Sequence, residues 1–440
     1  MQETKSLQQW LALAASQQSE DREVAARALR AYVHDHSGTT ALIKLLGDTD
    51  WRVRRAAVET FLQAQQLHTV PMVLEALYEE ENAGKRNAAL DILSRFGKGI
   101  IPYLEPHISA EQSDVVMFLI QILGDLRDTT YLPFINQALE NENPNVVSAA
   151  ILALGKIGRP DSVSPLLRFL EGPDLWLKTQ AIEALGEMQE PETIPNLIAH
   201  HSIPYCRKAI LNALAKIHAP MSYGALVEFL VHDGKLNPDA LEALVRLYHA
   251  PQPSRLKTEE QKAIREYCRK NLKPGYIGTL LESYRECSDA EKKNILEVLG
   301  WAAAEPAISL FVSELQNDWL IEAAAKGLIY CDETALSAIV HRLEQSNSNK
   351  EIVTLLSVLW ELSSVVDVKH IEKFLQCDVL EIRQAAHKLL ARMPASGALP
   401  FWIRSVSDGD PSVSESCREP LLSLCKRDAN SRAQIQTELR

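Results

Sequence analysis

The chain has 440 residues, of which 46% are hydrophobic, and its formal net charge is −12 at pH 7. This hydrophobic fraction is enough to build a large core and excludes an intrinsically disordered chain. The acidic balance argues against nucleic acid or an anionic membrane as the main partner, because both require a surplus of basic residues.

Cysteine usage and the lengths of the apolar segments favour a cytoplasmic protein. The seven cysteines are an odd number and include no Cys-x-x-Cys pair, a pattern typical of free thiols in a reducing compartment. No apolar run approaches the roughly 18 residues that a membrane helix needs, and the first residues do not resemble a signal peptide. We therefore expect a cytoplasmic protein that does not enter a membrane.

Prolines recur at intervals of 30 to 32 residues between Pro71 and Pro195, which is a sign of internal repetition. Two later prolines fit the same period once a single insertion is allowed. The members of this proline column are Pro71, Pro102, Pro133, Pro165, Pro195, Pro306 and Pro400.

A second column, of small or aliphatic residues, has the same period, and we refer to it as the repeat column. Its members are spaced by 29 to 32 residues, apart from one gap of 55 residues between Ala240 and Ile295. Both columns therefore place one insertion near residues 250–275. The members are Ala25, Ala57, Ala89, Leu119, Ala150, Ala181, Ile210, Ala240, Ile295, Ala324, Leu355, Ala385 and Ser416.

Each repeat is predicted to consist of two helices. In residues 160–189, an apolar stripe at helical spacing over 163–170 is followed by a Gly-Pro-Asp break at 172–174 and a second stripe over 177–188. The repeated proline falls in the first turn of the first helix, where its missing amide hydrogen has no intrahelical partner to lose.

Residues at the helix ends support the same division. The second helix often opens with a residue that can accept from free backbone amides, such as Asp50, Asn143 or Asp174. Glycines recur near the predicted helix ends, where we expect left-handed C-caps. These glycines are Gly47, Gly97, Gly124, Gly155, Gly158 and Gly186.

Three segments resemble the D-x-x-V-R-x-A-A-x-x-L-G-x-I-G pattern of HEAT repeats: Leu46–Leu62, Asn141–Gly158 and Leu380–Leu390. They are most similar to the short HEAT-like type also seen in phycobilisome lyases. With the two columns, this resemblance implies an all-α fold, an α-solenoid of about 13 stacked helical hairpins with one helical insertion near 251–273. In this family, the second helices of the hairpins line the concave face.

The sequence lacks the common motifs for nucleotide binding, serine hydrolysis and zinc proteolysis. None of the 12 histidines is followed by Glu, unlike the repeated His-Glu pairs of the HEAT-fold deoxyhypusine hydroxylase. We therefore predict no catalytic residue, no cofactor and no metal site. One alternative, a bilin lyase-type enzyme subunit, rests on the HEAT-like repeats alone.

A second alternative is a HEAT-like nucleic-acid-binding or DNA repair protein, similar to the alkylpurine DNA glycosylases. Such proteins need a concave face rich in Lys and Arg. Residues 1–250 hold 22 basic and 31 acidic residues, which disfavours this alternative.

One early position of the second helix is expected to be exposed, because Val53 and Ala57 occupy the buried face beside Arg52. Aromatic residues occupy this position in three repeats, and aromatic anchors commonly dominate protein interfaces. They are Trp176, Tyr205 and Trp319. The alternative is that the rings cover the neighbouring repeat. The other tryptophans, Trp51, Trp301, Trp360 and Trp402, we assign to packing.

The insertion is predicted to form a basic helix. Residues 258–261 match a capping box, so the helix should begin at Thr258 and run to about Leu272. Between residues 254 and 273, seven basic residues face three acidic ones. A cationic strip including Lys262, Arg265 and Arg269 would suit an acidic peptide or phosphate groups, whereas the alternative is a solvated face on a bridging helix.

We expect the insertion to interrupt the stacking of the repeats. The predicted segments are an N-terminal repeat segment at 1–250, an inserted bridging helix at 251–273 and a C-terminal repeat segment at 274–440. The predicted function is a non-catalytic scaffold or adaptor that binds one or more proteins along the concave face. The sequence leaves the oligomeric state open.

Overall fold

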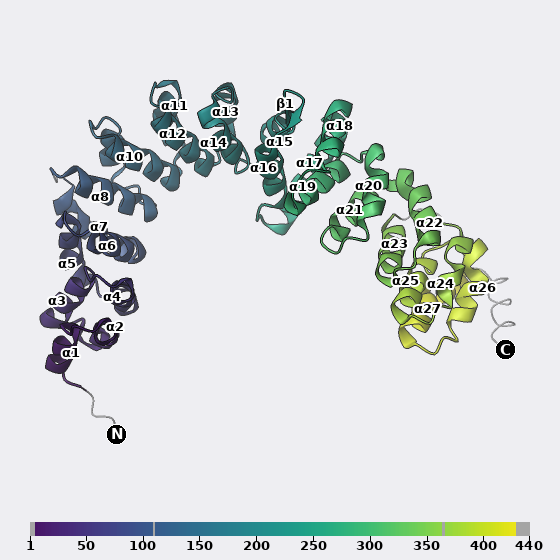
Figure 1. Ribbon diagram of the computed structural model, residues 1–440, viewed down its shortest axis with the longest axis horizontal. Coiled ribbons are helices and arrows are strands. Elements are labelled where there is room, and N and C mark those ends of the chain that lie inside the picture. Colours follow the sequence, from purple (N-terminus) through teal and green to yellow (C-terminus); the bar gives the residue numbers. More distant parts are fainter. Residues whose placement is uncertain (1–4, 109–110, 363–365, 428–440) are drawn as a thin grey trace. The chain divides into compact units, whose positions relative to one another are not determined.

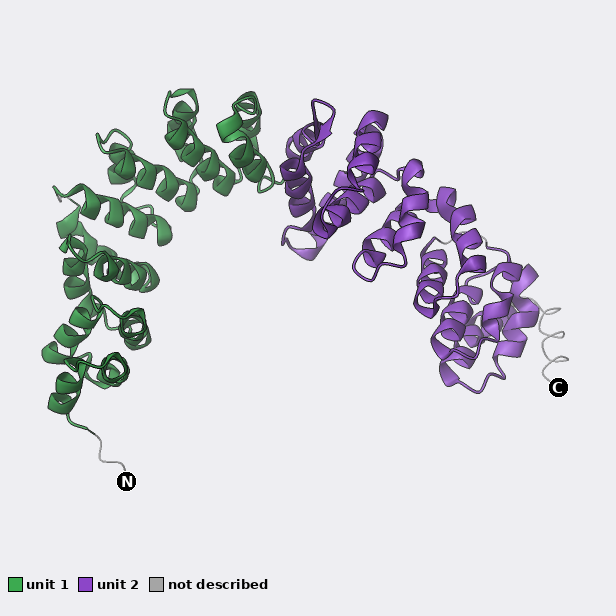
Figure 2. Ribbon diagram, in the orientation of Figure 1, with its two compact units in different colours: residues 1–218 green, residues 219–440 purple. Residues whose placement is uncertain are grey.

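The computed structural model describes residues 5–108, 111–362 and 366–427, and they form two compact units, 1–218 and 219–440 (Figures 1 and 2). Both units consist of helical hairpins. Unit 1 contains seven hairpins and unit 2 contains six, counted over the described residues. The expected all-α solenoid of about 13 hairpins is therefore confirmed.

In unit 1, odd-numbered helices are the first and even-numbered helices the second of each hairpin (Figure 1). The first helices are α1 (Leu7–Ala14), α3 (His36–Leu45), α5 (Val70–Glu75), α7 (Ile101–Leu104), α9 (Leu132–Ala138), α11 (Val163–Glu171) and α13 (Ile194–Ala199). The second helices are α2 (Ser19–Ala28), α4 (Trp51–Ala64), α6 (Ala83–Arg95), α8 (Ser113–Asp125), α10 (Pro144–Ile157), α12 (Leu175–Met188) and α14 (Pro204–Leu214).

Unit 2 has the same organisation, with one additional helix, α17 (Ser254–Asn271), and a short hairpin of strands β1 (Val231–His232) and β2 (Lys235–Leu236). The first helices are α15 (Pro220–Glu228), α18 (Pro274–Ser283), α20 (Ile308–Glu314), α22 (Leu336–Gln345), α24 (Glu372–Leu375) and α26 (Ala395–Ser405). The second helices are α16 (Pro238–His249), α19 (Asp289–Trp301), α21 (Ile321–Cys331), α23 (Asn349–Glu361), α25 (Leu380–Leu390) and α27 (Pro411–Arg427).

The repeat column forms the centre of the core. Its first eleven members, from Ala25 to Leu355, are completely buried. The last two, Ala385 and Ser416, are only half-buried. The periodicity of the sequence therefore identifies core residues correctly up to Leu355. In α25 and α27 the residues in the same register are partly exposed to solvent.

The predicted helix starts are largely confirmed. Asp50, Asn143 and Asp174 each accept a hydrogen bond from a backbone amide two residues later, which satisfies a donor that the helix leaves free. Prolines lie in the first turn of α5, α7, α9 and α13. Pro400 is an exception, because it lies inside α26.

Most of the predicted glycine caps have a different structural role. Gly158 is a left-handed C-cap of α10, with a φ angle of 69°. Gly97 also has a positive φ angle, of 79°, but its ψ angle of −176° is not that of a left-handed cap. Gly124, Gly155 and Gly186 instead lie inside their helices, at points where the next second helix approaches closely. Gly47 has no positive φ angle either, so the cap prediction was wrong for five of the six.

The close approach is between helix backbones. A Cβ atom on Gly155 would lie 2.7 Å from the Cα of Ala184, and one on Gly124 would lie 2.8 Å from the Cα of Ala153. Any side chain larger than hydrogen would therefore push the two helices apart. Glycine allows successive second helices of unit 1 to pack with almost no space between them.

The inserted helix begins earlier than the sequence indicates. Helix α17 starts at Ser254, directly after Pro253, and ends at Asn271. Thr258 does not cap it, because its hydroxyl donates back to the carbonyl of Ser254 at 2.9 Å. Buried Ile264 and Cys268 attach the helix to the rest of unit 2.

The insertion does not interrupt the stacking of the second helices, so that expectation was wrong. The rings of Tyr248 on α16 and Trp301 on α19 stack with centroids 4.1 Å apart. Next to them, His249 Nε2 lies 2.6 Å from Glu297 Oε2. Helix α17 thus lies within unit 2, and the segment boundaries at 250 and 273 stay a prediction.

Candidate protein-binding surface

The second helices of each unit present a continuous row of side chains within that unit, which we term the second-helix face. The aromatic residues predicted at its early position are solvent-exposed: Trp176, Tyr205 and Trp319 are 39%, 59% and 63% exposed. Trp176 and Tyr205 lie in the first turns of α12 and α14, whereas Trp319 lies in the turn two residues before α21 and not on the helix itself. The predicted exposure is confirmed, whereas a role in binding stays a prediction.

Trp176 stands at the edge of a groove in unit 1 that has a volume of about 250 Å³. Met117 and Leu152 provide its apolar lining, and Asn145 and Lys156 provide polar groups. The cap on α12 fixes the ring's starting point, because Asp174 accepts from the backbone amide of Trp176 at 2.8 Å. The indole therefore both lies against the neighbouring repeat and offers part of its face to solvent.

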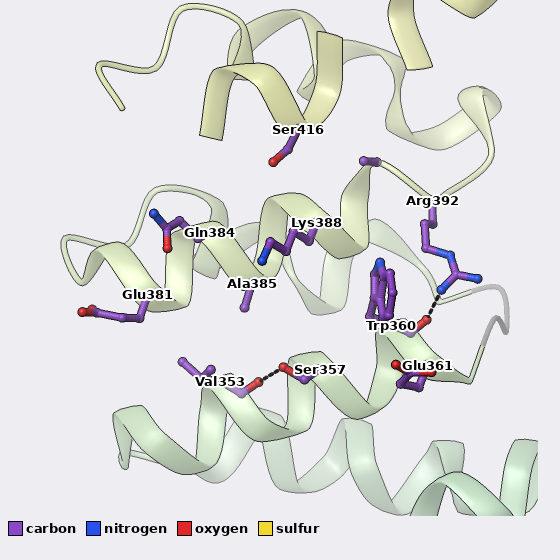
Figure 3. Close-up of a pocket in the computed structure, with 11 residues that line it drawn as sticks. Val353, Ser357, Trp360, Glu361, Glu381, Gln384, Ala385, Lys388, Arg392 and Ser416 are labelled. Atoms are coloured by element: carbon purple, nitrogen blue, oxygen red, sulfur yellow. Dashed lines mark hydrogen bonds between the residues drawn. The ribbon is translucent and has the colours of Figure 1, made fainter. Parts of the chain in front are cut away.

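A larger groove, of about 740 Å³, lies on the second-helix face of unit 2, and we term it the Trp360 groove (Figure 3). It runs between α23 and α25 and reaches Ser416 on α27. Val353 and Ala385 give it an apolar floor, and Trp360 forms a wall with 38% of its surface exposed. No pattern in the sequence indicates this groove.

Trp360 is held in place by Arg392. The guanidinium lies 4.6 Å from the centre of the indole ring, and its Nη1 donates to the Trp360 carbonyl at 2.6 Å. A ring held in this way loses little conformational freedom when a partner binds. The Trp360 groove is therefore preorganised.

The assignment of four tryptophans to packing is half right. Trp301 and Trp402 are buried, and the indole of Trp402 donates to the carbonyl of Leu390 at 2.9 Å. Trp51, at the start of α4, is 59% exposed, and Trp360 lines the groove. Trp51 is the residue directly before Arg52, whose position we expected to be exposed. This place in the register could have indicated that Trp51 is exposed as well.

The basic residues of α17 do not form a single open strip. Lys262 is exposed, with its Nζ 3.9 Å from Glu266. Arg265 Nη1 donates to the hydroxyl of Tyr248 at 2.6 Å, and Arg269 Nη2 donates to the carbonyl of Tyr330 at 2.6 Å. Two of the three predicted docking residues are thus engaged within unit 2, where they connect α17 to α16 and α21.

A cavity of about 310 Å³ lies beside these contacts, lined by Tyr248, Arg265, Trp301 and Lys326 among others. Burial, together with a hydrogen bond to Tyr330, raises the pKa of Tyr248 well above its ordinary value. The Tyr248 hydroxyl is therefore neutral at physiological pH and acts as an acceptor for Arg265.

Three buried thiols, of Cys268, Cys331 and Cys417, have low reactivity. Burial raises the pKa of Cys268 to about 12 and the pKa of both Cys331 and Cys417 to about 11. At neutral pH these thiols stay protonated, and the thiol is a poor nucleophile compared with the thiolate.

In the part of the chain that the structure describes, no three His, Cys, Asp or Glu side chains gather as a metal site. Every helix in that part is too short or too polar to cross a bilayer.

Comparison with solved structures supports the fold. One match, with a TM-score of 0.54 and 12% identity, is to a chain of a Kap95p–RanGDP complex. In that complex, Kap95p binding induces the switch loops of RanGDP to adopt the GTP-bound conformation. The match covers 95% of this chain and 62% of that chain, so this protein spans less than two thirds of its neighbour. Importin beta matches with a TM-score of 0.54 and 12% identity, over 95% of this chain and 71% of that chain.

Comparison of the sequence identifies the repeats themselves. The family model for HEAT repeats matches residues 7–94 and 101–185. The sequence matches no curated protein. The matched residues coincide with the hairpins α1–α2 to α11–α12, in which a repeat column residue is buried in every second helix. Residues 7–94 and 101–185 therefore consist of HEAT repeats.

Proposed function

We propose that this protein is a non-catalytic scaffold or adaptor of the cytoplasm that binds one or more partner proteins along its second-helix face. The observation that carries the proposal is the placement of partly exposed indoles, Trp176 and Trp360, at the edges of apolar grooves on that face. Aromatic anchors beside apolar pockets are the typical centres of protein interfaces. A prebuilt helical surface also binds without paying for its own folding.

The structural neighbours are consistent with protein binding, since Kap95p binds RanGDP. On the second-helix face of unit 1, basic side chains form ion pairs with acidic ones, which disfavours a nucleic-acid partner. Arg27 pairs with Glu59 at 3.0 Å, and Lys156 pairs with Asp125 at 2.5 Å, so these cations are already partly neutralised. The protonated thiols give no support to a lyase-type nucleophile.

Substitution of Trp176 tests the proposal. Partners captured by the full-length protein would be identified by mass spectrometry, and their affinities would then be measured for Trp176→Ala. We expect weaker binding with an unchanged Tm, because the ring is partly exposed. Leu67→Ala is the matched control, since Leu67 has the same 39% exposure but lies beside a first helix.

Two results would contradict the proposal. An equal loss of binding and of thermal stability in Trp176→Ala would show that the ring only covers the core. Equal losses of binding in Trp176→Ala and Leu67→Ala would show that the second-helix face has no special role.

A further inference from the structure

The Trp360 groove carries opposite charges along its length. Glu381, in the first turn of α25, and Lys388, two turns later, both line the groove and are exposed. In the described part of the chain, neither side chain has an ion-pair or hydrogen-bond partner. Figure 3 shows Glu381 at one end of the groove, Trp360 and Arg392 at the other, and Lys388 between them.

Some other charges on the second helices of unit 2 are paired within the protein. Lys326 binds Glu322 at 2.7 Å, and Lys350 binds Asp318. The Trp360 groove, in contrast, combines two unpaired charges of opposite sign with an apolar floor. Such a pattern is complementary to a ligand that has one basic group, one apolar group and one acidic group.

The spacing of the two charges indicates the kind of ligand. Glu381 and Lys388 are seven residues apart on one helix, which at 1.5 Å per residue separates their Cα atoms by about 10 Å along its axis. An extended peptide advances about 3.3 Å per residue and covers this distance in about three residues. The same distance requires about seven residues of a helical peptide.

The floor and wall of the groove define the apolar part of that ligand. Val353, Ser357 and Ala385 leave a shallow floor without bulky side chains. The indole of Trp360 rises beside this floor and is fixed by Arg392. An apolar side chain lying on this floor would bury its surface against the indole.

We propose that the Trp360 groove binds an extended segment of a partner protein in which a basic and an acidic residue are about three positions apart and an apolar residue lies beyond the acidic one. The basic side chain faces Glu381, the acidic side chain faces Lys388 and the apolar side chain packs on Trp360. This inference rests on the proposed scaffold function and specifies the partner's chemistry at one site.

Fluorescein-labelled decapeptides test the proposal with the full-length chain. Each peptide has a Gly/Ser background, Lys and Glu placed two to seven residues apart, and one Leu two residues beyond the Glu. Fluorescence anisotropy should show the tightest binding at a spacing of about three. An optimum at seven, or no dependence on spacing, would overturn the proposal of an extended segment.

Charge reversal tests the electrostatic pattern independently of the direction in which the peptide lies. Lys388→Glu should shift the preference from the Lys/Glu peptide to a Lys/Lys peptide, and Glu381→Lys should shift it to a Glu/Glu peptide. Each mismatch should cost about two- to fivefold in affinity, which is the usual range for one exposed ion pair. Affinities that do not respond to these reversals would refute the pattern.

Two further variants locate the binding. Trp360→Ala should weaken the best peptide about 10- to 30-fold, as expected for loss of an aromatic anchor. Met221→Ala, at an exposed apolar residue on first helix α15, should leave the affinity unchanged. Circular dichroism melting verifies that each variant is folded. If no peptide binds, the proposed ligand is wrong, whereas the scaffold function is judged separately by partner binding to Trp176→Ala.

Discussion

The middle of unit 1 and the end of unit 2 fill one repeat position in opposite ways. In each second helix, the residue five positions after the repeat column member faces the next second helix. There it meets the residue that lies three positions after that helix's own repeat column member. In unit 1 these positions hold glycine against alanine, with backbones almost in contact. The pairs are Gly124 with Ala153, Gly155 with Ala184 and Gly186 with Ala213.

In unit 2 the same two positions begin with Gly300 and Gly327, which also approach closely. Two hairpins later they hold Trp360 and Lys388, both of which line the Trp360 groove. The large side chains replace the glycine–alanine contact, and the repeat column member Ala385 becomes half-buried. One pair of side chains per repeat thus determines whether neighbouring second helices close on each other or leave a groove.

The largest effect is expected at the close contact itself. Gly155→Ala should lower the free energy of unfolding by about 3 kcal/mol, because the new methyl group meets the backbone of Ala184 at 2.7 Å. Urea unfolding followed by circular dichroism measures the change. In the control, Gly278→Ala, the methyl group meets no atom within 4 Å, and the gain in helix propensity should stabilise the protein by up to about 1 kcal/mol. Equal effects at both sites would break the comparison.

The ion pair between Glu351 and Arg342 makes the stability of unit 2 depend on pH. Burial alone raises the pKa of Glu351, but hydrogen bonds from Arg342 and Ser346 outweigh it and hold this pKa below its ordinary value. The resulting stability is present above the unfolded pKa of about 4.3 and is lost as the pH falls through the lower folded pKa.

Glu351→Gln should therefore lose about 1.5–3 kcal/mol of unfolding free energy at pH 7, and the difference from the wild type should shrink below about pH 4. Urea unfolding at a series of pH values measures this. A difference that stays constant down to pH 3 would show that the charge of Glu351 is not what stabilises unit 2.

Trp360 occupies the position in unit 2 that is equivalent to Gly155 in unit 1. Removing its side chain should have little effect on stability. Trp360→Ala should change the free energy of unfolding by less than about 1 kcal/mol, because the ring already lines an open groove. Thermal melting with calorimetry measures it. A loss similar to that of a buried tryptophan, about 3–5 kcal/mol, would mean that Trp360 supports the core and would remove the contrast between the two regions.

The smallest effect is expected at Trp51, the second exposed tryptophan that the sequence assigned to packing. Trp51→Ala should change the unfolding free energy by no more than about 0.5 kcal/mol, since most of the ring is in solvent. Chemical denaturation measures it, and a loss above 1 kcal/mol would restore the packing role assigned from the sequence.

The sequence predicted the repeat architecture well, because a buried residue every 30 or so positions leaves a periodic record. The repeat column, the caps at Asp50, Asn143 and Asp174, and the presence of an inserted helix all have local causes that can be found in the sequence. The exposure of Trp176 and Tyr205 followed from the same register.

What the sequence did not reveal depends on contacts between repeats. A glycine near a helix end suits both a left-handed cap and a close helix approach, and only the neighbouring alanine distinguishes the two at Gly155. Likewise, the stacking of Tyr248 on Trp301 joins residues on either side of the insertion, so no local pattern indicates it. The Trp360 groove was missed because its opening depends on two residues 28 positions apart.

The Tyr248–Trp301 stack also has an evolutionary consequence. Because the two helices already hold each other, the intervening segment can lengthen or shorten without separating the repeats on either side. Such a position allows a lineage to acquire an appendage of its own while the ancestral array is preserved. It is equally a natural place for an engineer to graft a reporter, with entry at the exposed residues Pro251 and Pro253.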